Sequence, residues 1–317
     1  MSTTSKTGVL YVSQIPVDTL IRTLRESKGI TQKALCEGLC SKDELSRIER
    51  GLRRPHWWLF EQLMQRLGED PQMYYAAYNS IITQEDKRVL DLRTKLSHLL
   101  RNPKQGDEAK ALIAHLEQDD AFKDGIHLQF LLKSKATLAY HNNDYKSLEK
   151  YAMDAIKLTK PTFCEDDIGN YILSSDEIRL IQHIAAARSL TSYEESANIL
   201  FKLKDALYKI GGEAKNKLYP SLVYNLSKCL GLIKRYNECI VLCDQGIDFC
   251  AEYRDSYYIP LLLVNKAFCL FHMQRNDDAI KVTKEAFLIF GALKRHAEIS
   301  AVKTAFKAEF GIYDVFD

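Results

Sequence analysis

The chain has 317 residues, which is enough for two domains or for one domain followed by a repeat array. Hydrophobic residues make up 46% and charged residues 27%, as in ordinary globular proteins, and only 7 Pro and 14 Gly disfavour a turn-rich all-β fold. A net charge of +2 excludes a uniformly basic protein but is compatible with a local basic patch.

Membrane and secreted classes are also disfavoured. No apolar run reaches the ~18 residues that a membrane helix needs, and the first residues lack the charged start and apolar core of a secretory signal. The 8 cysteines are scattered through helical patterns, which favours buried reduced thiols over disulfides. We therefore expect a cytoplasmic protein without a membrane partner.

The pattern of residues 15–69 predicts a bundle of short helices. Thr31 is a good N-cap for the second helix of this bundle. Ser41 and Glu44 have the spacing of a capping box, so the third helix should start at Lys42.

Special residues also mark the boundary between the third and fourth helices. Gly51 is placed for the left-handed residue that ends the third helix, and Pro55 should open the fourth. The inward-facing residues of the fourth helix should be Trp57, Phe60, Leu63, Met64 and Leu67. Two short helices joined by a tight turn are typical of a helix-turn-helix.

Two sequence stretches make this similarity specific. The segments TQKAL and LSRIERG, followed by Pro55, resemble the Xre/Cro class of DNA-binding domains. The turn before Ser41 is one residue shorter than usual in that class, and Cys40 stands where Gly-Val is common. This variant resembles the Rgg/PlcR branch, whose members join such a domain to helical repeats.

The resemblance implies that the N-terminal half of the third helix enters the major groove of DNA. By position, Lys42, Asp43 and Arg47 would face base edges, where Lys or Arg can bind guanine and Asp can accept from cytosine. Glu44 is left open, because the capping box can hold it. The candidate phosphate contacts are Gln32, Ser46, Arg50 and Arg54. Alternatively, all these residues are solvated charges around a helical bundle.

Four other polar residues of this domain are interpreted as structural. The resemblance implies that Arg25 and Glu49 form an ion pair beneath the helices. Cys36 and Cys40 are four residues apart, but no further Cys or His completes the four ligands of a zinc site. We therefore expect core packing there, and neither a metal nor a cofactor.

Residues 86–317 read as helix after helix, with a repeated unit of a polar turn and an amphipathic helix. The turns align on Tyr145, Tyr193, Tyr236 and Asn276, which are 48, 43 and 40 residues apart. This region resembles degenerate tetratricopeptide repeats, whose usual period is ~34 residues. We therefore predict an all-α chain, in which a helix-turn-helix bundle precedes a TPR-like α-solenoid.

A polar column accompanies these repeats. Eleven positions before each turn residue stand Ser134, Gln182, Asn225 and Asn265, in otherwise apolar helices. An amide offers both a donor and an acceptor, which suits the backbone of an extended peptide. Lys228, one turn after Asn225, could meet an acidic group or a C-terminal carboxylate. Alternatively, the amides bond between adjacent helices.

The two halves together resemble the RRNPP family, to which the Rgg/PlcR branch belongs. The resemblance implies a regulator of transcription that binds a double-stranded DNA operator as a homodimer and senses a short signalling peptide, as in quorum sensing. The implied organisation is a flexible N-terminus at 1–14, the DNA-binding domain at 15–69, a linker helix at 70–85, and a peptide-binding and dimerisation domain at 86–317. The segment 70–88 is expected to transmit the signal between the two domains.

Two other function classes remain in view. The repeats could form a protein–protein interaction scaffold that has no peptide ligand, with the helix-turn-helix domain still binding DNA. An enzyme is disfavoured, because the sequence has no H-E-x-x-H motif, no P-loop and no nucleophile elbow.

Overall fold

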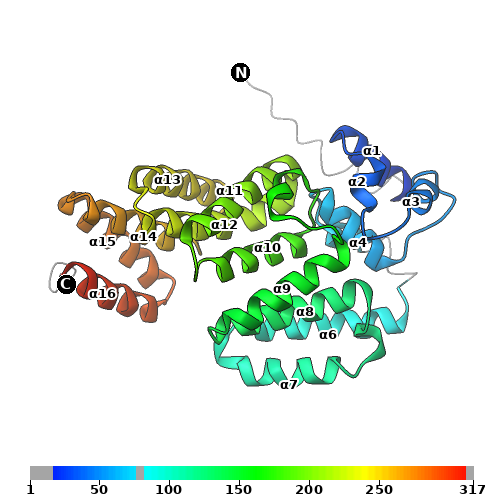
Figure 1. Cartoon of the computed structure of the whole chain (residues 1–317), viewed down its shortest axis with the longest axis horizontal. Helices are drawn as coiled ribbons and strands as arrows, with labels where there is room; N and C mark the ends of the chain where they lie inside the picture. The colour runs from blue at the N-terminus through cyan, green and yellow to red at the C-terminus, as the bar shows by residue number, and fades with distance from the viewer. Residues whose placement is uncertain (1–16, 76–81, 312–317) are drawn as a thin grey trace. The chain divides into compact units, whose positions relative to one another are not determined.

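The structure is a computed structural model that describes residues 17–75 and 82–311, and every regular element in these ranges is a helix (Figure 1). The predicted all-α fold is therefore confirmed over these residues. The chain forms two compact units. The first unit comprises the residues up to Cys164, Asn170–Leu180 and Ile210–Ala214, and the second comprises Glu165–Gly169, Ile181–Lys209 and the residues from Lys215 onward.

The head, which we define as α1 to α4, is the predicted helix-turn-helix bundle. Its helices are α1 (Val17–Ser27), α2 (Gln32–Cys36), α3 (Lys42–Glu49) and α4 (Trp57–Arg66). Thr31 caps α2 by accepting a hydrogen bond from the Ala34 amide at 3.2 Å, and Ser41 caps α3 by accepting from the Glu44 amide at 3.0 Å. The head buries apolar side chains from all four helices, among them Leu20, Ile21, Leu35, Leu45, Ile48, Phe60, Leu63 and Met64.

Two boundaries differ from the sequence-based expectation. Pro55 does not open α4, because His56 is the N-cap and its Nδ1 accepts a hydrogen bond from the Leu59 amide at 3.4 Å. Residues 70–85 do not form one linker helix. The short 3-10 helix η2 (Pro71–Tyr74) follows the head, and α6 begins afresh at Gln84.

The break before α6 has a local cause. Thr83 accepts from the Asp86 amide and Asp86 accepts from the Thr83 amide, each at 3.0 Å, so a capping box starts this helix. Tyr74 and Tyr75 pack edge-on against Phe60 and Trp57 of the head. Tyr78 and the rest of 76–81 lie outside the described residues.

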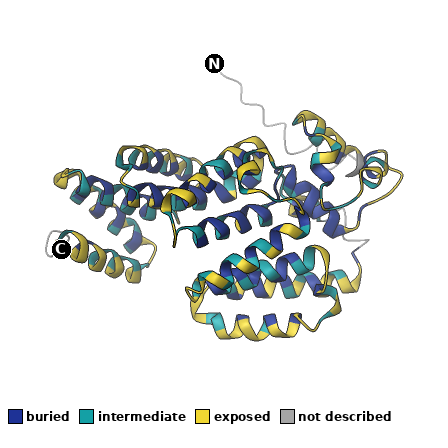
Figure 2. Cartoon of the chain, in the orientation of Figure 1, coloured by how far each residue is buried: buried dark blue, intermediate teal, exposed yellow. Residues whose placement is uncertain are grey.

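The remainder of the first unit is a stack of helices that lie side by side in Figure 1. Its elements are α6 (Gln84–Leu100), η3 (Pro103–Gln105), α7 (Gly106–Leu116), η4 (Asp120–Phe122), α8 (Gly125–His141) and α9 (Tyr145–Thr159). Figure 2 shows the buried face of α8 turned toward its neighbours and the outer face of α7 exposed. The strongest pairing is between α8 and α9, as expected for one two-helix repeat.

The later helices continue the repeat pattern. They are η5 (Glu165–Asn170), α10 (Ser175–Arg188), α11 (Tyr193–Ile210), α12 (Gly212–Leu232), α13 (Tyr236–Glu252), α14 (Ile259–His272), α15 (Asn276–Ala292) and α16 (His296–Phe310). Each residue used to align the repeats, Tyr145, Tyr193, Tyr236 and Asn276, is the first residue of a helix. Within the described ranges, no helix is both long and apolar enough to cross a bilayer.

Three turns of the second unit share a local stabilising feature. Lys234, Gln274 and Lys294 all adopt left-handed backbone conformations, with φ of 64°, 59° and 57°. The Arg that follows each one pairs with an acidic residue three positions later, as Arg235 does with Glu238 at 2.6 Å. This local ion pair and the closing backbone bond stabilise a turn that glycine usually makes.

Candidate nucleic-acid interface and polar column

The exposed face of α3 carries the residues that were expected to read bases. Lys42, Asp43 and Arg47 are exposed, and none of their side chains takes part in a hydrogen bond or ion pair with the described residues. Leu45 and Ile48 hold the opposite face of the helix in the head core. The helix thus presents unpaired donors and one acceptor to solvent from a rigid support.

Several charged side chains that flank this face already have partners within the head. Glu44 pairs with Arg53 at 3.2 Å, and Arg50 donates from Nε to the Ser46 carbonyl at 3.2 Å. Arg54 is exposed, and Ser46 is half-buried. Because these contacts are at the surface, they are weak enough to exchange for a phosphate contact.

Gln32 occupies a different environment from the one expected of a phosphate contact. Its Nε2 donates to Glu49 Oε2 at 2.8 Å, while Arg25 donates to the same carboxylate at 2.6 and 2.9 Å. The hydrogen bond to Glu49 raises the pKa of Arg25, and only 3% of the Glu49 side chain is exposed. The Arg25–Glu49 pair lies beneath the helices and holds one of the two Nε2 hydrogens of Gln32, so only the other is left for a phosphate.

A buried arginine on α4 fixes the head to the helices that follow it within the first unit. Arg66 is fully buried and donates to Glu177 at 2.6 and 3.3 Å. It also donates to the carbonyls of Leu35, Glu37 and Thr159. All five of its described hydrogen bonds therefore connect α4 either to the end of α2 or to the region of α9 and α10.

Glu177 is equally well satisfied. It accepts from the Thr159 hydroxyl and from the Ser174 amide, each at 2.6 Å. Burial alone would raise its pKa, but the Arg66 and Lys160 charges and these hydrogen bonds outweigh burial, so the pKa lies below its ordinary value. We call Arg66, Glu177, Thr159, Lys160 and Glu37 the seam network.

Lys160 and Gly38 belong to the same contact between the α2–α3 turn and the end of α9. Lys160 is 1% exposed and donates to Glu37 at 2.8 Å, and burial followed by the Arg66 charge lowers its pKa. Gly38 has φ of +67°, and a Cβ there would lie 2.1 Å from the Thr159 carbonyl oxygen. Only glycine allows the α2–α3 turn to approach α9 this closely.

The polar column of the repeats is only partly available to a ligand. Ser134 is 1% exposed and donates to the Phe130 carbonyl of its own helix, so it does not offer its hydroxyl to a peptide. Gln182 donates to Ser221 at 3.3 Å. Asn265 donates to the Tyr224 carbonyl at 3.2 Å and to Ser227 at 2.8 Å. The side chains of Gln182 and Asn265 therefore form hydrogen bonds between helices, which was the alternative to peptide binding.

Asn225 and Lys228 differ from the rest of the column. Both lie on α12, where Asn225 is half-buried and Lys228 is exposed. Neither side chain makes a hydrogen bond or ion pair with the described part of the chain. Asn225 is therefore the column residue whose amide forms no hydrogen bond within the described residues, and Lys228 lies one turn after it on the same helix.

Six of the eight cysteines are buried, while Cys40 is half-buried and Cys164 is exposed. Cys36 is buried, and burial raises the pKa of the Cys40 thiol to about 12. Across residues 17–75 and 82–311, no three His, Cys, Asp or Glu side chains are arranged to hold a metal ion.

Comparison with known proteins identifies the head. A family model described as a helix-turn-helix domain matches residues 19–73. The head is a helix-turn-helix domain. The match includes α3, so the exposed Lys42, Asp43 and Arg47 lie within this helix-turn-helix domain. No curated protein sequence matches the chain.

Solved structures extend the similarity to most of the chain. One is Bacillus thuringiensis PlcR in complex with the peptide PapR7 and DNA, which is 19% identical, covers 90% of this chain and 98% of its own, and has a TM-score of 0.57. The apo form of the same protein is 18% identical, covers 90% and 97%, and has a TM-score of 0.56. The chain therefore shares its fold, a helix-turn-helix domain followed by helical repeats, with these structures.

The seam network is absent from the sequence-based set of functional residues. Arg66 stands in the apolar stretch WWLFEQLMQRLG, and that context was the available signal that it is buried. Its partner Glu177 is 111 residues away. A pairing over this distance leaves no periodic trace in one sequence.

Proposed function

We propose that this chain is a DNA-binding regulator of transcription, and not an enzyme, whose repeats sense a short signalling peptide and thereby control operator binding by a homodimer in the cytoplasm. The observation that carries the proposal is the exposed, unpaired set Lys42, Asp43 and Arg47 on α3 of a helix-turn-helix domain. The fold shared with PlcR, which was solved with a peptide and DNA, supports the pairing of the two activities.

The proposed reading mechanism follows from donor chemistry. Arg47 can donate two parallel hydrogen bonds to guanine O6 and N7, Lys42 can donate to the same edge, and Asp43 can accept from a cytosine amino group. Arg50 and Arg54 would contact phosphates, which set affinity and register. Two heads in a dimer would read half-sites separated by a multiple of about 34 Å.

DNA binding is tested by selecting sequences from a random duplex library with the full chain and measuring affinity for the enriched site. Arg47→Ala should weaken binding by about tenfold to a hundredfold, the loss expected for one bidentate base contact. Arg22→Ala is the matched control, because Arg22 is an exposed head arginine on α1 that pairs with Glu26. No enriched sequence, or unaltered affinity of Arg47→Ala, contradicts this part of the proposal.

Peptide sensing is assigned to α12. Asn225 would bind the peptide main chain, and Lys228 would meet its C-terminal carboxylate, because these two side chains have no other partner among the described residues. As a matter of thermodynamics, the peptide alters DNA binding only if it binds one arrangement of the dimer better than the other.

A library of short synthetic peptides, prepared with free and with amidated C-termini, tests this assignment by calorimetry. Asn225→Ala should weaken binding about fivefold, since one hydrogen bond is worth about 1 kcal/mol, and amidation should mimic the effect of Lys228→Ala. Unchanged peptide affinity in both variants contradicts the assignment. Co-purification of a stoichiometric folded partner, with no peptide bound, favours an interaction scaffold instead.

A further inference from the structure

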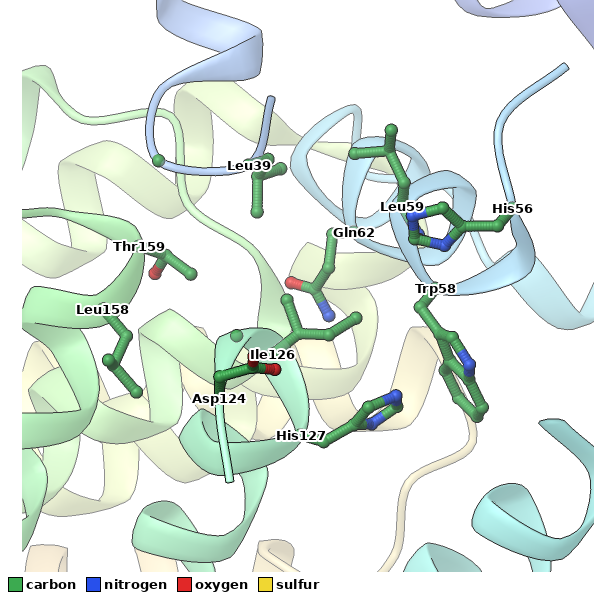
Figure 3. A pocket seen from close by; sticks show the side chains of 12 residues that line it. Leu39, His56, Trp58, Leu59, Gln62, Asp124, Ile126, His127, Leu158 and Thr159 are labelled. Atoms are coloured by element: carbon green, nitrogen blue, oxygen red, sulfur yellow. The ribbon is translucent and has the colours of Figure 1, made fainter. Parts of the chain in front are cut away.

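A cavity of about 270 Å³ lies inside the first unit, and no residue of the polar column lines it (Figure 3). Its walls come from the α2–α3 turn, α4, the start of α8 and the end of α9. The lining residues are Gly38, Leu39, His56, Trp58, Leu59, Gln62, Asp124, Gly125, Ile126, His127, Leu158 and Thr159. It therefore touches both the head and the first helical repeat.

Gln62 is the unusual member of this lining. It is 1% exposed, and its Oε1 is buried without a hydrogen-bond partner in the described structure. In Figure 3 its carboxamide points into the space between Leu39, Ile126 and Thr159. A buried amide oxygen without a partner costs roughly 1–3 kcal/mol, so its presence needs an explanation.

A second polar group of the cavity is also unsatisfied. His127 Nδ1 is buried and has no partner among the described residues, while its ring packs edge-on against Trp58 with 4.6 Å between centroids. Burial and the nearby Arg93 charge lower the pKa of His127 to about 4, so the ring is neutral at physiological pH. Asp124 precedes α8 without capping it through its side chain.

Polar groups just outside the cavity behave differently. Gln129 donates from Nε2 to the Ala155 carbonyl at 3.0 Å and to the Thr159 hydroxyl at 2.6 Å. Arg66 and Glu177 are completely bonded, as described above. Two buried side-chain atoms without a hydrogen-bond partner, Gln62 Oε1 and His127 Nδ1, thus belong to the cavity lining, while the two others found in the described structure, Trp57 Nε1 and Gln65 Oε1, lie on α4 outside it.

The polar and apolar groups that line the cavity indicate which class of ligand it could bind. The Gln62 carboxamide offers one acceptor and two donors, a pattern that another amide group complements. A neutral imidazole beside it, and the Asp124 carboxylate, disfavour an anion. Trp58, Leu39, Ile126 and Leu158 supply apolar surface, and the volume is at the lower end of the range for ligand pockets.

We propose that this cavity is a binding site for a small uncharged carboxamide, whose amide group pairs with Gln62 while its apolar body packs between Leu39, Ile126 and Leu158. The proposal is independent of DNA and peptide binding, because none of the residues assigned to those activities lines the cavity. An occupant would contact the head and the α8–α9 pair at once. Binding would therefore stabilise their observed arrangement by mass action.

Benzamide is the probe, and benzoate is its charged counterpart of matched shape. The full chain contains 2 tryptophans, so labelling the indoles with ¹⁵N gives a simple spectrum in which Trp58 reports on the cavity. Comparison with Trp57→Phe assigns the two signals. Titration with benzamide should shift the Trp58 signal in a saturable way, with millimolar affinity, and benzoate should bind at least about tenfold more weakly.

Gln62→Met preserves side-chain length and removes the amide. It should weaken benzamide binding by about tenfold, the loss of two hydrogen bonds, without unfolding the chain. Gln118→Met is the matched control, because Gln118 is exposed on the turn after α7 and does not line the cavity. The control should bind benzamide like the parent chain.

A second variant tests the proposal independently, in case Gln62→Met does not fold. Leu158 is half-buried on α9, so Leu158→Trp should fill the cavity and abolish the benzamide response. The proposal is overturned if benzamide gives no saturable shift, if benzoate binds equally well, or if neither Gln62→Met nor Leu158→Trp weakens binding. A cavity that holds only water would produce the first of these outcomes.

Discussion

The seam network of the first unit and the polar column of the second differ in how their polar side chains are satisfied. In the seam network, Arg66 and Glu177 are fully buried, and both are hydrogen-bonded by several groups of the protein itself. In the column, Asn265 and Gln182 bond to neighbours, while Asn225 on the same kind of helix has no partner among the described residues. A polar residue in an apolar helix is therefore structural or available according to what lies within reach, and not according to its type.

The largest expected effect comes from breaking the seam network. Arg66→Met leaves the Glu177 carboxylate buried without its partner, which should cost about 3–5 kcal/mol of unfolding free energy in urea titrations. Arg88→Met is the control, because Arg88 also makes several carboxylate bonds but is 42% exposed, and it should cost less than about 1 kcal/mol.

A double variant separates the charge from the packing. Arg66→Met combined with Glu177→Leu removes both buried charges and should recover part of the loss, because no charge is then left unpaired. Equal losses for Arg66→Met and Arg88→Met would show that the seam network does not hold the first unit together.

A smaller effect should follow pH at His127. Burial is the main cause of its lowered pKa, the Arg93 and His56 charges act in the same direction, and Asp86 opposes them. Because the unfolded state binds the proton first, stability should fall as pH decreases from 6.5 to about 4. The ring is partly exposed, so we expect a loss of about 2 kcal/mol and not the full value of the shift.

His127→Phe keeps the ring contacts with Trp58 and Phe122 and cannot titrate. Its denaturation free energy, measured against pH, should be flatter than that of the parent chain between pH 6.5 and 4. His115→Phe changes an exposed histidine on α7 and should leave the parent profile unaltered. Parallel profiles for the parent chain and His127→Phe would contradict the assignment.

Local signals explain how much of this structure the sequence could predict. The caps at Thr31 and Ser41 and the left-handed Gly51 were correctly assigned, because each depends on residues within one helical turn. The repeat period located the turn near Tyr236, although the structure places Tyr236 itself just after the turn, as the first residue of α13. The start of α4 was misplaced, since a histidine cap at position 56 competes with the proline signal before it.

The candidate sites were predictable only in part, because their chemistry depends on distant partners. Exposure of Lys42 and Arg47 follows from the helical period that buries Leu45 and Ile48. By contrast, Gln62 reads as an ordinary polar residue of α4 until α8 and α9 are packed against it. Sequence separation hides such contacts, as it hides the pairing of Arg66 with Glu177.

The smallest expected effect compares two asparagines of the polar column directly. Asn265→Ala removes the bonds to the Tyr224 carbonyl and to the Ser227 hydroxyl, both between α12 and α14, and should cost about 1 kcal/mol. Asn225→Ala removes no bond within the described residues, and alanine is the better helix former, so stability should change by less than about 0.5 kcal/mol. Urea denaturation of both variants measures the difference. If Asn225→Ala costs as much as Asn265→Ala, Asn225 is also a structural residue, and the peptide contact assigned to it has no basis in the fold.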